Sequence, residues 1–114
     1  MIRSVAITGA TGFIGRHAAA ALAGRGVVVK AIVRPGSRHR PPPESTAVHA
    51  PLDTAELRKA FAGLDAVIHL AGVVAAVHAR TFFEVNTDGT RAVAEAARDA
   101  GARLIHVSSQ SNLR

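Results

Sequence analysis

The stretch that decides the fold is VAITGATGFIGRHAAAALAGRG, residues 5–26. An apolar run stops at Gly9, and an alanine-rich run follows Gly12 and Gly15. An apolar run ended by glycine is typical of a buried strand, and alanine favours a helix. Strand, glycine turn and helix in this order predict a phosphate-binding loop, in which the helix N-terminus offers free N–H groups to an anion. The alternative is a plain structural turn.

The rest of the chain repeats this alternation. Strands are predicted over 2–8, 27–33, 46–50, 65–72 and 102–109, helices over 12–24, 53–63 and 80–100, and a proline-rich loop over 34–45. Strands this apolar are covered on both faces, which indicates a parallel sheet between helices. One face of the last helix is expected to be buried, because apolar and small residues recur there at spacings of three or four: Phe82, Val85, Gly89, Val93, Ala96 and Ala100.

Composition limits the class of protein. A chain of 114 residues fits one domain, and its 48% hydrophobic content is enough for a core. It contains no cysteine, which excludes disulfides and a thiolate site, and its six histidines fall at no metal-ligand spacing. No apolar stretch approaches the roughly 20 residues of a membrane span, and no signal peptide is recognised. We therefore expect a soluble, cytoplasmic protein without a metal site.

The positive charge raises nucleic acid as a partner. The net charge is +6 and the pI is about 11.5, and the densest basic cluster is RPGSRHR, residues 34–40. The basic residues are, however, spread from Arg3 to Arg114, and no aromatic residue interleaves with this cluster. A solvated surface is the simpler interpretation, and nucleic acid is not the expected partner.

Four motifs occur in an order that is typical of one superfamily. They are TGATGFIG (8–15), DAVIHLAG (65–72), VNTDGTRAVAEAA (85–97) and LIHVSS (104–109). With them the chain resembles the short-chain dehydrogenase/reductase superfamily, in its extended NAD(P)-dependent epimerase/dehydratase branch or an atypical relative. The resemblance implies an α/β fold, a Rossmann-type parallel sheet of about five strands in the order 3-2-1-4-5, with helices on both faces.

The resemblance also implies a set of cofactor-binding residues. The pyrophosphate loop would consist of Gly9, Thr11, Gly12, Phe13, Ile14 and Gly15, and the ribose and nicotinamide would lie beside Leu70, Ala71 and Gly72. Asp53 would accept a hydrogen bond from the adenine, although its place before a helix also predicts an N-cap. His69 is as readily a packed residue as a functional one, and Asn86 would brace the sheet from a buried position.

The choice between NAD(H) and NADP(H) depends on the end of the second strand. An acidic residue about 20 positions beyond the glycines marks NAD, because it accepts bonds from the ribose 2′-hydroxyl. Here Arg34 follows that strand, and no Asp or Glu lies between residues 27 and 43. Arg34 and Arg38, with help from Arg16, are expected to bind a 2′-phosphate, so NADP(H) is preferred to NAD(H). The alternative is that Arg34 stacks on the adenine ring with either cofactor.

The residues that carry the chemistry of the superfamily are missing. Its members use a Tyr and a Lys four residues later, with a Ser after the fifth strand that orients the substrate oxygen. Ser109 is the candidate for that Ser, with Ser108 and Ser111 as neighbours, but the chain has no Tyr, and its only lysines are Lys30 and Lys59. We therefore expect the chain to lack the catalytic segment and the substrate region, and to self-associate through an exposed strand edge.

The function predicted from the sequence is nicotinamide dinucleotide binding in an epimerase/dehydratase or reductase. The substrate implied by the resemblance carries a hydroxyl or carbonyl group, as a nucleotide sugar does. His78 and Arg80 are placed to meet an anionic substrate, although a solvated loop is the favoured interpretation of this segment. A non-catalytic, redox-sensing NADP(H) module is the alternative.

Overall fold

The computed structural model describes residues 1–70 and 79–107, which form a parallel sheet between two helical layers. The strands are β1 (Ser4–Thr8), β2 (Val28–Val33), β3 (Thr46–His49), β4 (Ala66–His69) and β5 (Arg103–His106). The helices are α1 (Phe13–Gly24), α2 (Thr54–Phe61) and α3 (Ala79–Ala100). All eight elements lie where the sequence predicts them. Within the described residues the strands are shorter than predicted; residues 71–72 and 108–109, at the ends of two predicted strands, lie outside the described part of the chain.

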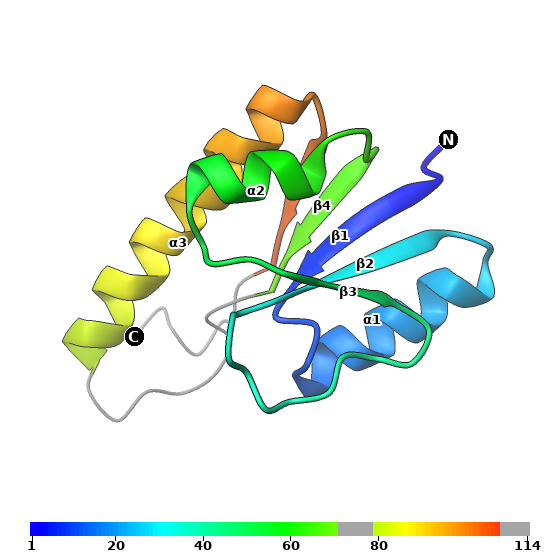
Figure 1. Ribbon diagram of the computed structural model, residues 1–114, viewed down its shortest axis with the longest axis horizontal. Coiled ribbons are helices and arrows are strands. Elements are labelled where there is room, and N and C mark those ends of the chain that lie inside the picture. Colours follow the sequence, from blue (N-terminus) through cyan, green and yellow to red (C-terminus); the bar gives the residue numbers. More distant parts are fainter. Residues whose placement is uncertain (71–78, 108–114) are drawn as a thin grey trace.

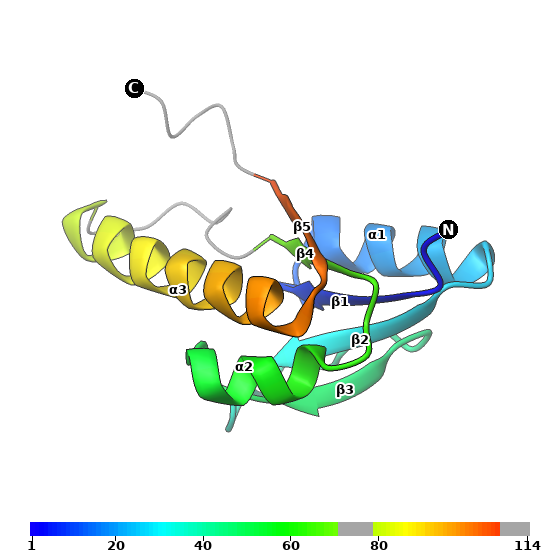
Figure 2. The ribbon, with the colours of Figure 1, turned by 90° about the horizontal axis from the view of Figure 1, so that it is seen from above.

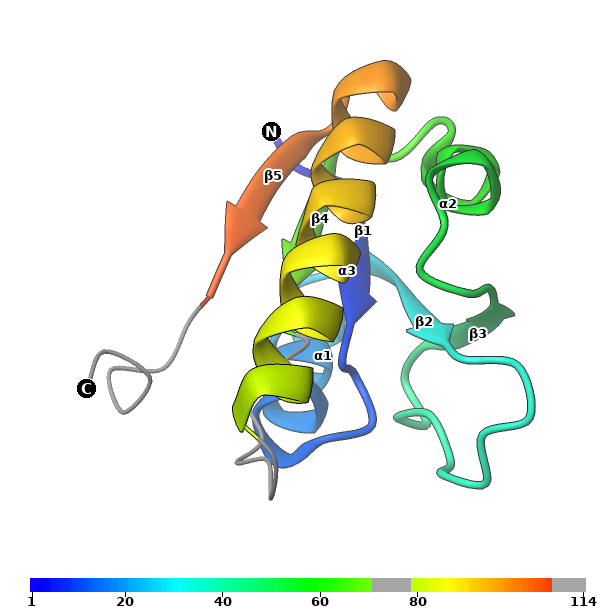
Figure 3. The ribbon, with the colours of Figure 1, turned by 90° about the vertical axis from the view of Figure 1, so that its left-hand side faces the viewer.

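The strand order is β3-β2-β1-β4-β5, and every pairing is parallel (Figure 1). This confirms the predicted order 3-2-1-4-5. Figure 3 shows β5 at the edge of the sheet opposite β3, with β1 in the middle. The central strand is therefore flanked by β2 on one side and β4 on the other, and the register aligns Thr8 with Ile32 and with His69.

The two faces of the sheet pack against different helices (Figure 2). Side chains of β1 alternate between the faces, as the period of a strand requires: Ala6 belongs to one core cluster, and Val5 and Ile7 belong to the other. The first cluster is completed by α2 and α3 with Leu57, Phe61, Val93, Ala96 and other residues, and the second by α1 with Ala19 and Leu22. Both faces are covered near the centre, as predicted for a parallel sheet.

The buried face of α3 agrees with the predicted spacing where its side chains are described. Val93 and Ala96 are fully buried, and Gly89 lies against the side chain of Leu52. A Cβ at Gly89 would come within 2.9 Å of Leu52 Cδ1, so the glycine lets this helix pack closely. The side chains of Phe82, Val85 and Asn86 lie outside the described part of the chain.

Candidate functional site

The candidate site lies at the edge of the sheet where the strands end. Because the strands are parallel, their carboxyl ends meet at this edge (Figure 1). The glycine loop, residues 9–15, follows β1, and the basic loop, residues 34–40, follows β2. The strand order reverses between β1 and β4. In an open α/β sheet, ligands bind in the crevice beside such a reversal.

The three glycines of the glycine loop have different physical roles. Gly9 has a φ of 73°, a left-handed conformation that side chains disfavour. A Cβ at Gly15 would lie 2.4 Å from the Gly9 carbonyl oxygen and 2.5 Å from Ala10 Cα, so α1 packs on the loop only because this residue has no side chain. At Gly12 the nearest atom is 3.5 Å away, an ordinary contact. The fold therefore needs glycine at 9 and 15, whereas at 12 it leaves room for a methyl group.

The N-terminus of α1 has no side-chain cap. Gly12 is the N-cap residue and carries no side chain, and the first turn contains no acidic residue. The first intrahelical bond is donated by Arg16 N to the Gly12 carbonyl at 3.0 Å. Within the described residues, the N–H groups of Phe13 and Ile14 have no acceptor, and both side chains are exposed. These N–H groups and the positive end of the helix dipole form a place for an anion.

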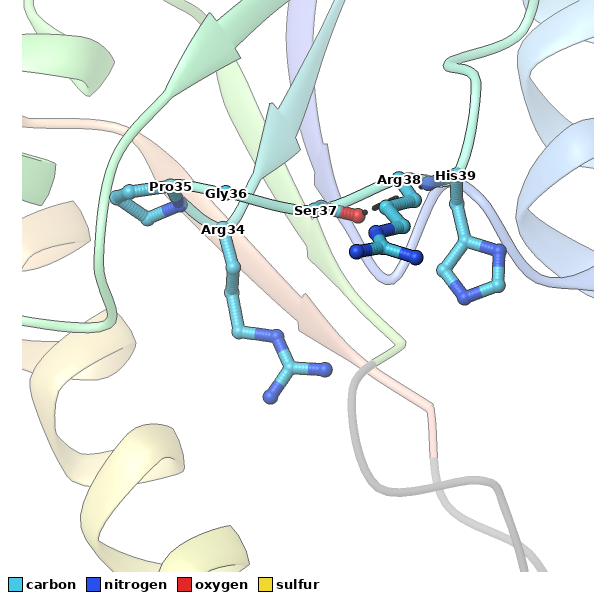
Figure 4. Close-up of a pocket in the computed structure, with 6 residues that line it drawn as sticks. All are labelled: Arg34, Pro35, Gly36, Ser37, Arg38 and His39. Atoms are coloured by element: carbon cyan, nitrogen blue, oxygen red, sulfur yellow. Dashed lines mark hydrogen bonds between the residues drawn. The ribbon is translucent and has the colours of Figure 1, made fainter.

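The basic loop places two guanidinium groups beside an open hollow (Figure 4). The hollow has a volume of about 480 Å³ and is lined by Arg34, Pro35, Gly36, Ser37, Arg38 and His39. Figure 4 shows Arg34 and Arg38 extending to the same side of the loop backbone. Both residues are exposed, and no ion pair joins either of them to a described carboxylate. Their positive charge is therefore available to an anionic ligand.

Arg16 makes two backbone contacts that the sequence did not indicate. Its Nε donates to the Thr11 carbonyl oxygen at 3.2 Å, and its second guanidinium nitrogen, Nη2, donates to the carbonyl oxygen of Arg40. The guanidinium thus joins the backbone of the glycine loop to the backbone of the basic loop. These bonds use two of the five N–H donors of the guanidinium, so the predicted help of Arg16 in binding a phosphate stays a prediction.

Asp53 caps α2, as its place before the helix predicts. One carboxylate oxygen, Oδ2, accepts a hydrogen bond from Glu56 N at 3.2 Å, and the Asp53 carbonyl accepts from Leu57 N at 2.9 Å. The residue is exposed and follows β3 at the carboxyl edge of the sheet. The cap uses one oxygen of the carboxylate, so the second remains available to a ligand at this edge. Its contact with adenine stays a prediction.

A buried polar network lies under the glycine loop, and only His69 in it was singled out from the sequence. Thr8 Oγ1 lies 2.6 Å from His69 Nδ1, and His69 Nε2 lies 3.0 Å from Thr90 Oγ1. Leu70 N donates to both the carbonyl and the hydroxyl oxygen of Thr8, at 3.1 and 3.2 Å. Both nitrogens of the buried ring have partners, so His69 is a packed residue that ties β1 and β4 to α3.

The same histidine is held in its neutral form. Its ring stacks on that of His106, with centroids 5.3 Å apart, in the register that pairs β4 with β5. Burial, with a smaller contribution from the nearby His106, lowers the pKa of His69 to about 4. Polar residues at the ends of two neighbouring predicted strands were the signal for this network. Thr90 had no such signal, because its distance from His69 in the sequence hides the contact.

Several predicted site residues lie outside the described part of the chain. They are Ala71, Gly72, His78, Ser108, Ser109 and Ser111, and the side chain of Arg80. Leu70 is described and is 5% exposed, so it belongs to the core cluster beneath α1 and contributes its backbone to the edge of the sheet. The described side chains include no group of three His, Cys, Asp or Glu residues that could bind a metal ion. None of the helices within residues 1–70 and 79–107 has the length and apolar character needed to cross a membrane.

Comparison with known proteins finds one matching family model and several related proteins. A sequence model of the NAD dependent epimerase/dehydratase family matches residues 5–113. Ceramide reductase of Caulobacter vibrioides is 46% identical over 111 residues, which cover 92% of this chain and 34% of that protein. A 4-hydroxy-2-methyl-3-oxo-4-farnesyl-3,4-dihydroquinoline-1-oxide ketoreductase of Stigmatella aurantiaca is 34% identical over 113 residues, 94% of this chain and 34% of that protein.

A solved structure matches nearly the whole chain. It is a uronate dehydrogenase variant from Agrobacterium tumefaciens complexed with NAD, which is 25% identical with a TM-score of 0.76 and covers 96% of this chain and 42% of that one. The chain spans about a third of the length of the curated relatives named above, which are 34% covered. The comparisons therefore concern one part of longer proteins.

Proposed function

The chain belongs to the NAD dependent epimerase/dehydratase family, and from that premise we propose that it binds the nicotinamide dinucleotide of a carbonyl reductase. The glycine loop would hold the pyrophosphate, and the basic loop would hold the 2′-phosphate on the adenosine ribose. A bound nicotinamide dinucleotide supplies or accepts hydride, and this part of the protein would bind and orient it.

Gly12 is the observation that carries the proposal. The protein itself leaves space for a side chain there, since the nearest atom to a Cβ is 3.5 Å away. The residue nevertheless lies at the uncapped N-terminus of α1, beside the free N–H groups of Phe13 and Ile14. No neighbouring protein atom requires glycine at this position, and unpaired N–H donors lie beside it. A phosphate that approaches the backbone closely explains why glycine is found there.

We propose NADP(H) as the preferred cofactor. Arg34 follows β2 directly, at the position where an acidic residue would accept bonds from a ribose 2′-hydroxyl. Arg34 and Arg38 border one hollow and extend to the same side of the loop (Figure 4). A 2′-phosphate is doubly charged at neutral pH, and guanidinium groups bind it through charge-assisted hydrogen bonds. Neither arginine has a competing ion pair with a described carboxylate.

The substrate proposal follows the curated relatives. The two relatives are named as a ceramide reductase and a ketoreductase of a farnesyl-substituted quinoline oxide. We therefore propose reduction of a carbonyl on a large, mostly apolar substrate, in preference to a reaction on a nucleotide sugar. In this proposal Ser109 would orient the substrate oxygen, and Leu70, Ala71 and Gly72 would border the nicotinamide half of the cofactor.

The cofactor proposal is tested by calorimetric titration with NADPH and with NADH. Arg34→Glu removes a donor and places a negative charge beside the expected 2′-phosphate. A hydrogen bond to a charged group contributes about 1.5–3 kcal/mol, so NADPH should bind at least about tenfold more weakly. NADH, which has no 2′-phosphate, should bind about as it does to the unaltered protein, or more tightly.

Arg25→Glu is the matched control. Arg25 is an exposed arginine at the opposite end of α1, away from the carboxyl edge, so the substitution makes the same change in net charge. It should leave both affinities unchanged. If Arg25→Glu weakens NADPH as much as Arg34→Glu does, the effect is general electrostatics and the assignment of Arg34 is wrong. Equal affinity of the unaltered protein for NADPH and NADH would also contradict the preference.

A further inference from the structure

The side chain of Arg16 joins two loops that the sequence separates. Arg16 is the fourth residue of α1, and its Nε donates to the Thr11 carbonyl within the glycine loop at 3.2 Å. Its Nη2 donates to the carbonyl of Arg40, which is 24 positions further along the chain. A guanidinium group has its donors in one rigid plane, so it can hold two carbonyl groups in a defined geometry.

The other hydrogen bonds of this region lie before and after Arg40 in the sequence. On the N-terminal side, Ser37 N donates to the Arg34 carbonyl at 3.1 Å, and His39 N donates to Ser37 Oγ at 3.3 Å. Both of these bonds are internal to the loop. On the C-terminal side Pro42 is fully buried, and its carbonyl accepts from the Ser45 hydroxyl at 2.7 Å.

Among the hydrogen bonds of residues 1–70 and 79–107, the one from Arg16 to the Arg40 carbonyl connects the basic loop with the glycine loop. Arg38, which carries one of the two guanidinium groups of the hollow, lies two residues before the attached carbonyl. The position of Arg38 relative to the glycine loop therefore depends on this contact.

We propose that Arg16 is a positioning residue that determines cofactor specificity through the basic loop. Arg16 would fix the distance between the basic loop and the glycine loop. At that distance one dinucleotide would bind with its pyrophosphate at the N-terminus of α1 and its 2′-phosphate beside Arg34 and Arg38. The inference rests on the proposed function, and it assigns to Arg16 a role that requires no contact with the cofactor.

A population argument gives the expected size of the effect. If the loop without its attachment adopts the binding conformation only a tenth of the time, the apparent Kd for NADPH rises about tenfold. NADH uses the glycine loop but has no phosphate for the basic loop, so its Kd should change by less than about twofold. The ratio of the two affinities is therefore the quantity that reports on Arg16.

The experiment uses Arg16→Met, which keeps most of the side-chain length and removes the donors, and Arg16→Lys, which keeps the charge. NADPH and NADH are titrated calorimetrically into each variant and into the unaltered protein. Limited trypsin digestion without cofactor measures the loop directly. Within the basic loop, Arg34 and Arg40 precede prolines, which trypsin resists, so cleavage after Arg38 reports on this segment. Arg25→Met is the control for loss of an exposed arginine from the same helix.

For Arg16→Met we expect faster cleavage after Arg38, a Kd for NADPH raised about tenfold and a nearly unchanged Kd for NADH. Arg16→Lys should fall short of the unaltered protein in both assays, because an ammonium group cannot span the two carbonyls as a planar fork does. The thermal unfolding midpoint should stay near that of Arg25→Met.

Three results overturn the inference. Full NADPH affinity in Arg16→Lys would mean that charge alone matters, as for a direct phosphate contact. Equal weakening of NADPH and NADH in Arg16→Met would place Arg16 at the shared pyrophosphate. Unchanged cleavage after Arg38 would mean that the contact does not hold the loop. If the unaltered protein bound neither dinucleotide, the proposed function and this inference would both be wrong. That result differs from the three above because it is seen without any variant.

Discussion

Alanine at Gly12 and alanine at Gly15 should damage the protein in different ways. At Gly15 the added Cβ would lie 2.4 Å from the Gly9 carbonyl oxygen and 2.5 Å from Ala10 Cα, and both atoms belong to the backbone. The loop or the start of α1 must move to relieve these contacts. Overpacking of this kind costs about 1–3 kcal/mol of unfolding free energy, and more when backbone must shift.

At Gly12 the same substitution meets no such obstacle. The nearest atom to the added Cβ is 3.5 Å away, and the backbone has a φ of −79° and a ψ of 174°, which alanine adopts without strain. Restricting the unfolded chain would stabilise the protein by about 0.4–1 kcal/mol. Alanine is a poorer N-cap than glycine, which offsets much of that gain. We expect the unfolding free energy to stay within about 1 kcal/mol of its original value.

For Gly12→Ala the effect on cofactor binding should be large, although its effect on stability is small. The new methyl group would occupy the place where the pyrophosphate approaches the N–H groups of Phe13 and Ile14, so NADPH should bind at least about tenfold more weakly. Urea unfolding measures the stability of both variants, and calorimetric titration with NADPH measures binding. A folded Gly12→Ala protein that binds NADPH normally would refute the reasoning. So would a loss of stability at Gly12 as large as that at Gly15.

Three further predictions concern the rest of the described structure. Because the pKa of His69 is lowered from 6.5 to about 4 in the folded protein, the unfolded chain binds this proton first. Stability is then full above pH 6.5 and falls as the pH drops towards 4. Urea midpoints across this range should show the decline, and His69→Gln should flatten it. Asp53→Ala should cost about 0.5–2 kcal/mol of stability through the lost cap, and Asp53→Asn much less; equal losses would argue against the cap. Ile105 is 40% exposed on β5, and the outer edge of β5 pairs with no described strand. Ile105→Lys should therefore reduce self-association, measured by sedimentation velocity. A wholly monomeric parent chain would contradict this prediction.

The fold could be predicted because its signals are local and repeated. Apolar runs that glycine or a loop interrupts indicated the positions of the five described strands, and the family resemblance implied their order in the sheet. The glycine loop was also predictable, since a strand, three glycines and a helix follow one another directly. The sequence also predicts cofactor contacts at residues 71–72 and a substrate contact at residue 109. These residues lie outside the described part of the chain, so their roles remain predictions.

The side-chain contacts of the site could not be predicted in the same way. Nothing in the sequence indicated that the guanidinium of Arg16 bonds to the carbonyls of Thr11 and Arg40. That outcome depends on how the loop after β2 folds back over α1, which no local pattern records. The partners of His69, Thr8 and Thr90, are likewise set by strand register and by the packing of α3. Such contacts between distant residues are decided by tertiary structure and need coordinates.

The central claim is that the N-terminus of α1 holds the pyrophosphate of a nicotinamide dinucleotide. The most direct measurement is a ¹H–¹⁵N NMR titration of the labelled protein with NADPH that follows the backbone amides of the glycine loop. The account predicts that the amides of Phe13 and Ile14 shift most, because their free N–H groups donate to the phosphate. Binding of NADPH that leaves these two amides unmoved, or no binding at all, would contradict it.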